Sequence, residues 1–264
     1  MAKFGIAHLS IVPVRAEASD ASEMVSQLLF GETFQIIKTK GNWTRISQSL
    51  DNYEGWIDLK QYIDIDEKAY RTLSPLPHTC ASDLVQLVKS EEGNMTPIVA
   101  GSTLPNYKKS RISFADKKLE FDGEICHPKG GDLKKMLREN ALTYRNAPYL
   151  WGGRSPFGVD CSGFTQVIFK MAGIAISRDS SEQAKLGHTL SFVEEADIGD
   201  LAFFDNDEGT IIHVGMIIAP ATIIHASGKV RIDSLDHQGI FNVDTKRYTH
   251  KLRLLRRLNE LEST

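Results

Sequence analysis

The sequence lacks what several classes of protein need. Its net charge is -3 over 264 residues, so it offers no broad basic field for a phosphate backbone. Zinc-finger spacing, aromatic-basic interleaving and a Walker-type glycine loop are also missing. The longest apolar run, "TIIHVGMIIAPATIIHA", is broken by histidines and a proline before it reaches the roughly 20 apolar residues of a membrane helix. We therefore expect no nucleic-acid partner and no membrane partner.

Cysteine is scarce as well. Cys80, Cys126 and Cys161 are an odd set without the close spacing of metal ligands, so we expect no metal site. The first residues, "MAKFGIAHLSIVPVRAE", lack the apolar core of a secretory signal. Sparse cysteines without a signal favour reduced thiols, and we expect a cytoplasmic protein.

The rest of the composition is that of a globular protein, with 41% hydrophobic and 25% charged residues. The length suggests one medium domain and one or two small ones. Short β-rich runs between Ile6 and Asp66 predict a small β-barrel, within which Ser19–Glu32 reads as a long loop with one helical turn. A second, proline-punctuated series of strands follows. We predict domains at 1–67, 68–128 and 129–264.

Helical patterns mark the third predicted domain. "DLKKMLRENALTY" has apolar residues at near-helical spacing behind a capping Asp. "CSGFTQVIFKMAGI" predicts a helix that begins at Cys161, buries an apolar face and ends at Gly173. Apolar, β-rich runs then continue to Leu258. Helices followed by an antiparallel meander predict an α+β fold.

The position of Cys161 has chemical consequences. A thiol at a helix N-terminus faces unpaired N–H groups and the positive end of the helix dipole, and both favour the thiolate. The same N–H groups suit the oxyanion that forms when a carbonyl is attacked. Cys161 is thus a candidate nucleophile, although a lone cysteine is more often a buried, inert side chain.

Two histidines on consecutive apolar strands are candidates for its base. Alternation in "TIIHVGMII" puts His213 on the same face as Gly215. A hairpin would bring His225, 12 residues later, close to His213. This order predicts a Cys-His-His triad in which His213 is the base and His225 orients it. The alternative is that each histidine is an ordinary core or edge residue.

These motifs together resemble a known family. "YLWGGRSPFGVDCSGF", "SRDSSEQAKLG", "IGDLAFF", "HVGMII" and "IIHAS", in this order, are similar to the NlpC/P60 family of papain-like cysteine peptidases. The resemblance covers about Asp132 to Leu258, and the N-terminal half resembles one or two bacterial SH3 (SH3b) barrels. The whole chain resembles the YkfC-like γ-D-glutamyl-L-diamino acid endopeptidases. It implies the same roles for Cys161, His213 and His225.

The resemblance also implies a substrate, a murein tri- or tetrapeptide with a free N-terminal L-Ala, cut between γ-D-Glu and meso-diaminopimelate or lysine. Asp160 would receive the ammonium group, and the alternative for it is a helix cap alone. Ser162, Arg178 and Ser180 would bind the D-Glu carboxylate, with a structural ion pair to Asp179 or another acid as the alternative for Arg178. Tyr149 would help line the oxyanion site, or else pack as a loop aromatic.

In relatives of this kind, the first SH3b barrel closes one end of the cleft with a tyrosine and an acid. Tyr53 matches the tyrosine, and the acid is Glu23 or Glu32, of which we favour Glu23. The alternative for all three residues is an ordinary turn or solvated surface position.

The sequence therefore predicts a monomeric, cytoplasmic cysteine peptidase of cell-wall peptide recycling that needs no metal or organic cofactor. Two rival functions remain open. One keeps the fold for an amidase or acyltransferase acting on another substrate. The other is a wall-binding SH3b protein with a silent catalytic domain.

Overall fold

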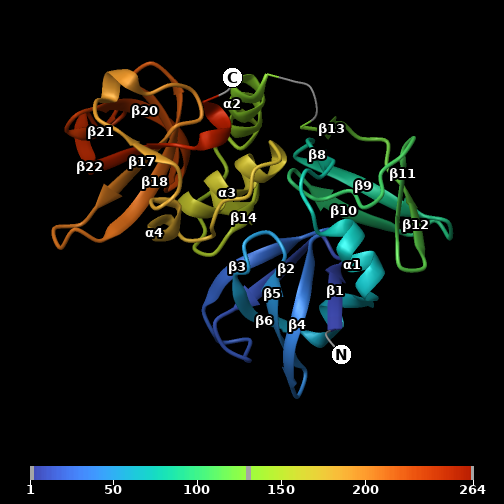
Figure 1. Ribbon diagram of the computed structural model, residues 1–264. Helices are drawn as coiled ribbons and strands as arrows, with labels where there is room; N and C mark the ends of the chain where they lie inside the picture. The colour runs from blue at the N-terminus through green and yellow to red at the C-terminus, as the bar shows by residue number, and fades with distance from the viewer. Residues whose placement is uncertain (1–2, 129–131, 263–264) are drawn as a thin grey trace.

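The computed structural model describes residues 3–128 and 132–262, which form three parts that meet around one helix. Figure 1 shows the first part in blue at the bottom and the second, from cyan to green, on the right. The third part runs from the green helix labelled α2 through yellow to red and carries the central helix α3 (Cys161–Met171). The third part therefore contacts both of the others.

The first part is a small antiparallel barrel of seven strands, in the order β3-β2-β6-β5-β4-β1-β7. Its core contains Val12, Phe34, Ile46 and Ile57, which are all fully buried. The short helix α1 (Glu67–Leu73) follows, and its N-cap Asp66 accepts a hydrogen bond from the amide of Ala69. The strands are β1 (Lys3–Ala7), β2 (Ile11–Arg15), β3 (Met24–Leu29), β4 (Thr33–Lys40), β5 (Trp43–Gln48), β6 (Glu54–Asp58) and β7 (Tyr62–Ile65).

Strand β3 corrects the prediction of a loop with a helical turn in this region. Its middle residues, Ser26 and Gln27, are polar, so the run lacks the alternation that marks a strand, yet both are buried. The Ser26 hydroxyl accepts a hydrogen bond from Arg178 Nε at 3.2 Å, and Gln27 Oε1 accepts one from the Arg154 amide at 2.8 Å. These residues are polar because the strand faces the third part of the chain.

The second part contains a four-stranded antiparallel sheet in the order β10-β9-β12-β11 and a separate β8–β13 pair. Val88, Ile98 and Phe121 from this part share one core with Ile6 and Phe30 from the first. The two β parts are therefore packed together. The strands are β8 (Cys80–Ala81), β9 (Val85–Ser90), β10 (Met95–Val99), β11 (Arg111–Phe114), β12 (Lys117–Glu120) and β13 (Ile125–Cys126). The exact domain boundaries stay predictions.

The third part places helices before a seven-stranded antiparallel sheet, in the order β16-β22-β17-β18-β19-β20-β21. Strand β21 also pairs with β22, so six of these strands close into a barrel. Helix α2 (Leu133–Thr143), the β14 (Arg154–Ser155) and β15 (Gly158–Val159) hairpin, α3 and α4 (Ser180–Gln183) come first. The strands are β16 (His188–Leu190), β17 (Leu201–Asp205), β18 (Ile211–Ala219), β19 (Thr222–Ser227), β20 (Lys229–Asp236), β21 (Gly239–Asn242) and β22 (Arg247–Arg257). Single 3₁₀ turns lie at Leu59–Gln61, Val193–Glu195 and Asn259–Leu261.

Helix α3 is buried along its whole length. The apolar face predicted from the sequence is confirmed, since Phe164, Val167, Ile168 and Met171 all have 0% exposure. Burying each such side chain contributes about 1.5–3 kcal/mol, so this helix is firmly anchored. Gly173 follows the helix with φ of +82°, the left-handed conformation expected after its C-terminus.

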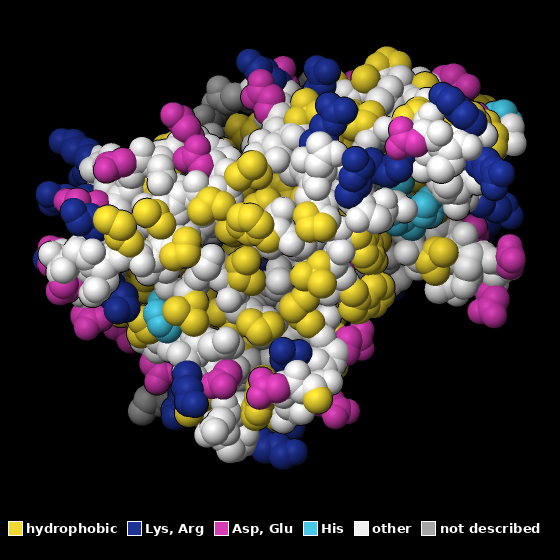
Figure 2. Space-filling model, turned by 180° about the vertical axis from the view of Figure 1, so that it is seen from behind, with side chains coloured by type: hydrophobic (Ala, Val, Ile, Leu, Met, Phe, Trp, Pro, Cys, Tyr) yellow, Lys and Arg dark blue, Asp and Glu magenta, His cyan; other side chains and the backbone are white. Residues whose placement is uncertain are grey.

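Figure 2 shows hydrophobic side chains gathered over the middle of the face seen from behind, where the three parts meet. Within residues 3–128 and 132–262, no helix is both long and apolar enough to cross a membrane.

Candidate active site

Cys161 is the first residue of α3 and is 7% exposed. The helix begins here because Asp160 acts as its N-cap, with Oδ1 accepting a hydrogen bond from the Gly163 amide at 2.7 Å. Cys161 also lines a cavity of about 500 Å³. The structure thus presents this thiol at a helix N-terminus that opens into a hollow.

The electrostatics of Cys161 differ from the expectation of a resting thiolate. Burial and the negative charge of Asp160 raise the pKa of the thiol to about 11, and the backbone amides of Val214 and Ser162 and the charge of Arg178 only partly oppose this. The expected thiolate stabilisation by the helix N-terminus is real but smaller than these two effects. At neutral pH the resting group is the thiol, so attack requires a base.

Two histidine rings lie together on the neighbouring strands, as the hairpin argument expected. His213 on β18 and His225 on β19 are joined by a 2.9 Å hydrogen bond between Nε2 of His213 and Nδ1 of His225. Gly215 lies directly opposite His225 across these strands. A Cβ at Gly215 would lie 2.8 Å from the His225 Cβ, so the glycine leaves room for this histidine. The Val214 amide beside Cys161 shows that β18 passes the thiol.

Two further residues of this cluster escaped the sequence reasoning. Asp233 on β20 accepts a hydrogen bond from Nε2 of His225 at 3.0 Å and is 2% exposed. His250 on β22 stacks on the His213 ring with a centroid distance of 4.2 Å and an interplanar angle of 24°. No motif in the sequence around them indicated a site. Both lie on later strands, and closure of the barrel is what places them next to His213 and His225.

Burial lowers the pKa of two histidines of this cluster, His213 and His250. Burial lowers the pKa of His213 well below its ordinary value, and the neighbouring His225 and His250 add to the effect. Burial, with a contribution from His225, also lowers the pKa of His250 to about 4. At neutral pH His213 is therefore an uncharged imidazole, the form that can accept a proton from the thiol.

Asp160 and Arg178 form a buried ion pair with each other. Nη2 of Arg178 donates to Asp160 Oδ2 at 2.5 Å, and Nη1 donates to Asp160 Oδ1 at 3.1 Å and to the Ser162 hydroxyl at 2.9 Å. The amide of Gly152 also donates a hydrogen bond to Asp160 Oδ2, at 2.8 Å. The Asp160 carboxylate is thus already paired with a cation. Both terminal nitrogens of the Arg178 guanidinium already donate hydrogen bonds within the protein. The structural ion pair that was the alternative for Arg178 exists, with Asp160 and not with Asp179 as its acid.

The cavity has a polar end made by two parts of the chain. Glu23 and Tyr53 of the first barrel line it together with Trp151, Asp179 and Ser180 of the third part. The Tyr53 hydroxyl interacts with the Asp179 carboxylate. Trp151 is 61% exposed, and its Nε1 donates to Glu23 Oε1 at 2.6 Å. Asp179 was not among the residues predicted from the sequence to bind substrate.

Burial dominates the titration of the two groups at this end. It raises the pKa of Tyr53 to about 12, with the charge of Asp179 adding to the effect. It also raises the pKa of Asp179, although Arg178 opposes this. Tyr53 therefore remains a hydrogen-bond donor at neutral pH.

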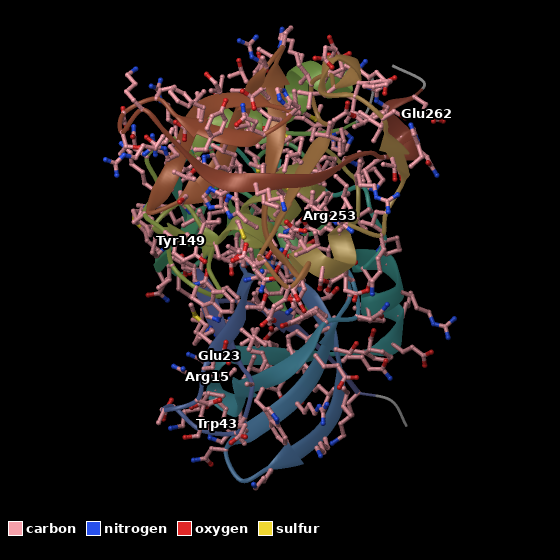
Figure 3. The ribbon with its side chains drawn as sticks, turned by 90° about the vertical axis from the view of Figure 1, so that its left-hand side faces the viewer. Arg15, Glu23, Trp43, Tyr149, Arg253 and Glu262 are labelled. Atoms are coloured by element: carbon pink, nitrogen blue, oxygen red, sulfur yellow. The ribbon has the colours of Figure 1, made fainter. Side chains whose placement is uncertain are left out.

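The two candidate acids of the first barrel lie in different places. Glu23 lies at the edge of the cavity, and Figure 3 shows it on the first barrel below Tyr149 of the third part. Glu32 lies outside the cavity lining, 7% exposed, and pairs with Arg154 and Lys170. The geometry favours Glu23 as the acid that faces a ligand.

Tyr149 lies close enough to the thiol for the charge of Cys161 to contribute to raising its pKa, which burial raises first, to about 12. The phenol is therefore protonated at neutral pH and able to donate. The residue is 37% exposed.

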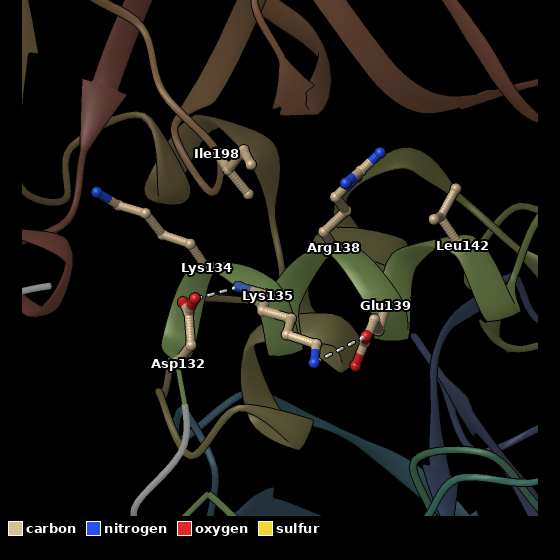
Figure 4. A pocket seen from close by; sticks show the side chains of 7 residues that line it. All are labelled: Asp132, Lys134, Lys135, Arg138, Glu139, Leu142 and Ile198. Carbon is tan, nitrogen blue, oxygen red and sulfur yellow. Dashed lines mark hydrogen bonds and ion pairs between the residues drawn. The ribbon is translucent and has the colours of Figure 1, made fainter.

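A second, larger hollow lies along α2 and has different chemistry. Its volume is about 840 Å³, and Figure 4 shows long charged side chains on the helix with Ile198 opposite. Asp132 accepts a hydrogen bond from the Lys135 amide at 3.1 Å, and Lys135 pairs with Glu139 at 3.9 Å. Its lining contains no cysteine and no histidine. Of these two hollows, it is the smaller one that Cys161 lines, together with Glu23 and Asp179.

Comparison with known proteins agrees with this geometry. Residues 146–250 match the NlpC/P60 family, and residues 14–61 match the bacterial dipeptidyl-peptidase Sh3 domain. The chain is 28% identical to the γ-D-glutamyl-L-lysine dipeptidyl-peptidase of Bacillus cereus, over 79% of this chain and 68% of the relative. It is 26% identical to dipeptidyl-peptidase 6 of Lysinibacillus sphaericus, over 84% of this chain and 88% of the relative.

The fold is shared with solved structures. A crystal structure of an NlpC/P60 family protein from Bacillus cereus superposes with a TM-score of 0.78 at 20% identity, over 96% of this chain and 99% of the other. An NlpC/P60 endopeptidase from Photobacterium damselae gives 0.70 at 18% identity, over 95% and 70% of the two chains. The α+β fold with a small SH3-type β-domain at the N-terminus is thereby confirmed.

Proposed function

We propose a substrate for this chain, which is an NlpC/P60 family peptidase with a bacterial SH3 domain: a murein peptide with a free N-terminal L-Ala. The bond cut would be that between γ-D-Glu and the following L-diamino acid. The names of the Bacillus relatives support a γ-D-glutamyl-L-lysine bond. The observation that carries the proposal is the acidic end of the cavity, where Glu23 and Asp179 approach from two parts of the chain.

An acidic, walled end suits a short substrate that begins with an ammonium group. Glu23 and Asp179 supply negative charge, and the Tyr53 hydroxyl interacts with Asp179. We place the ammonium here and not on Asp160, because Asp160 is already neutralised by Arg178. A hydrogen bond between charged partners contributes about 1.5–3 kcal/mol, or roughly 10- to 100-fold in binding. Peptides blocked at this amine would lose that contribution.

The D-Glu α-carboxylate needs hydrogen-bond donors in the same cavity. Ser180 lines the cavity and remains a candidate for this role. Ser162 and Arg178 also line it, but their bonds to each other and to Asp160 make them supports for the site first. Arg178 still contributes a positive charge to the cavity lining.

The proposed chemistry follows from the groups around Cys161. His213 takes the thiol proton as the sulfur attacks the γ-carbonyl carbon, and a C–S bond forms while the carbonyl oxygen becomes an oxyanion. The backbone N–H of Cys161 and the Tyr149 hydroxyl stabilise that oxyanion. The C–N bond then breaks, and His213 returns its proton to the departing amine. Water, deprotonated by His213, hydrolyses the thioester and restores the thiol.

A pair of substrates tests the proposal. L-Ala-γ-D-Glu-L-Lys and its N-acetyl form differ only at the amine, and we expect kcat/KM to fall roughly 10- to 100-fold on acetylation. Glu23→Gln should remove part of that preference by slowing only the free peptide. Glu67→Gln, an exposed change on α1, is the matched control. Equal cleavage of both peptides would overturn the proposal, while a diaminopimelate analogue would report the preference at the third residue.

The recycling role and the cytoplasmic location stay predictions. The monomeric state is likewise proposed and is open to measurement by light scattering.

A further inference from the structure

We infer that Asp233 is a positioning residue that sets the direction of a proton relay through His225 and His213. In this arrangement the unprotonated Nδ1 of His213 is the atom left to accept the proton of the Cys161 thiol. The inference rests on the catalytic roles proposed for these residues, and it adds a fourth member to the Cys-His-His set.

Four donors hold the Asp233 carboxylate in a fixed orientation. Oδ2 accepts from His225 Nε2 at 3.0 Å and from Arg231 Nε at 2.6 Å. Oδ1 accepts from Arg231 Nη2 at 2.9 Å and from the Val243 amide at 3.0 Å. The Asp233 side chain is fully buried, so its charge interacts with these donors at low dielectric.

This environment keeps Asp233 ionised. Burial by itself would raise its pKa, but the hydrogen bonds from His225 and Arg231 more than compensate and hold the pKa below its ordinary value. An ionised carboxylate only accepts hydrogen bonds, so it cannot donate to His225. The shared proton of the 3.0 Å contact therefore belongs to His225 Nε2.

The tautomers of both rings follow from that assignment. A neutral imidazole carries one proton, so in the neutral form of His225 a proton on Nε2 leaves Nδ1 unprotonated. The 2.9 Å contact then requires Nε2 of His213 to be the donor to Nδ1 of His225. Nδ1 of His213 is consequently unprotonated and keeps a free lone pair. When it takes the thiol proton, the resulting imidazolium is stabilised by the chain of acceptors that ends at Asp233.

Other charged groups near the relay do not compete for this role. His250 stacks on His213 from β22 with its ring face and does not contact Asp233 by a hydrogen bond among the described residues. Arg231 also pairs with Asp244 at 3.0 Å, but the Asp244 side chain is 71% exposed. Asp244 touches the same arginine and not the histidines, which makes it a matched control.

Imidazole nitrogen chemical shifts test the inference without any activity measurement. In protein labelled with ¹⁵N-histidine and carrying Cys161→Ala, we expect both His213 and His225 to be protonated at Nε2 and not at Nδ1 at pH 7.5. A spectrum in which His225 carries its proton at Nδ1 would overturn the inference, even if the enzyme cleaves the proposed peptide.

Variants test the functional consequence. Asp233→Asn replaces one acceptor oxygen by an NH₂ donor, which must face either His225 and Arg231 or Arg231 and Val243. We expect kcat to fall roughly 10²-fold, the lower end of what an oriented general base contributes, with KM little changed. The His225 tautomer should become mixed or reversed. Asp244→Asn should leave kcat within about twofold and the tautomers unchanged.

The outcomes separate this inference from the proposed function. Should the wild type fail to cut the murein peptide, the substrate proposal fails while the tautomer measurement still stands. Asp233→Asn with wild-type kcat and an intact melting transition would refute the positioning role. If that variant does not fold, the spectrum of the Cys161→Ala protein still decides the direction of the relay.

Discussion

Loss of the Glu32 carboxylate should destabilise the whole chain, because this side chain joins the first part to the third and its partner Lys170 also binds the second. Oε1 accepts from Lys170 Nζ at 2.6 Å and from Arg154 Nη2 at 2.9 Å, and Oε2 accepts from Arg154 Nη1 at 2.7 Å. Lys170 belongs to α3 and also donates to the Gly101 carbonyl of the second part at 2.8 Å. Glu32, Arg154 and Lys170 are 7%, 0% and 1% exposed. Glu32→Ala would leave two buried cations without their counterion.

The lowered pKa of Glu32 and the typical cost of breaking a buried ion pair both give the size of the expected loss in stability. Burial would raise the pKa of Glu32, but Arg154 and Lys170 outweigh it and lower the pKa from 4.5 to about 2. A tenfold change in an ionisation constant is worth about 1.4 kcal/mol, so the native environment favours the carboxylate by roughly 3 kcal/mol. Removing one partner of a buried ion pair typically costs about 3–5 kcal/mol. Total stability of domains is only about 5–15 kcal/mol, so this loss is large.

The pH dependence of this contribution has a definite sign. Because the folded pKa is lower than the unfolded one, the stabilisation is fully present above pH 4.5 and is lost as the pH falls through about 2. The cluster should therefore contribute equally at pH 6 and pH 8.

Urea unfolding at pH 7, followed by fluorescence and circular dichroism, measures the effect. We expect Glu32→Ala to lower the free energy of unfolding by about 3–5 kcal/mol, with Glu32→Gln close behind because it also removes the charge. Glu67→Gln breaks an exposed pair with Arg71 and should cost at most about 0.5 kcal/mol. A Glu32→Ala value within 0.5 kcal/mol of the wild type, the most an exposed pair would cost, would refute the reasoning.

Three further predictions concern the active site. The rate of Cys161 alkylation by iodoacetamide should rise about tenfold per pH unit from pH 7 to 9, because its pKa is near 11; a plateau below pH 7 would show a resting thiolate. Gly215→Ala should lower kcat and cost about 1–3 kcal/mol in unfolding free energy, since the added Cβ meets His225, and full activity would argue against this crowding. Arg178→Lys keeps the charge but loses the two-pronged bond to Asp160, so kcat/KM should fall about 10-fold or more; unchanged kinetics with the free peptide would contradict the supporting role.

Much of the fold could be predicted because the local pattern and the buried environment agree. Helix α3 is the clearest case, since its apolar spacing, the capping Asp160 and the terminal Gly173 all indicate the same bounds. Strand β3 was missed for the opposite reason. Ser26 and Gln27 are buried against another part of the chain and bind arginines there, so their polarity reflects a long-range contact that no local pattern contains.

In the site, too, residues within local motifs could be predicted, whereas residues placed by long-range contacts could not. Cys161, His213 and His225 stand in motifs, and the structure brings the two histidines into contact and passes β18 beside the thiol. Asp233 and His250 lie on later strands in unremarkable sequence, and only closure of the barrel brings them back. The ionisation of Cys161 could not be predicted from its place at the helix N-terminus, because burial outweighs that field.

The central claim is that Cys161 cuts the bond after γ-D-Glu in a short murein peptide. Mass spectrometry of the products from L-Ala-γ-D-Glu-L-Lys tests it most directly, with wild type and Cys161→Ala compared at equal concentration. We expect L-Ala-γ-D-Glu and free lysine from the wild type, and intact peptide from the variant. Cleavage between L-Ala and D-Glu, or equal cleavage by Cys161→Ala, would contradict it.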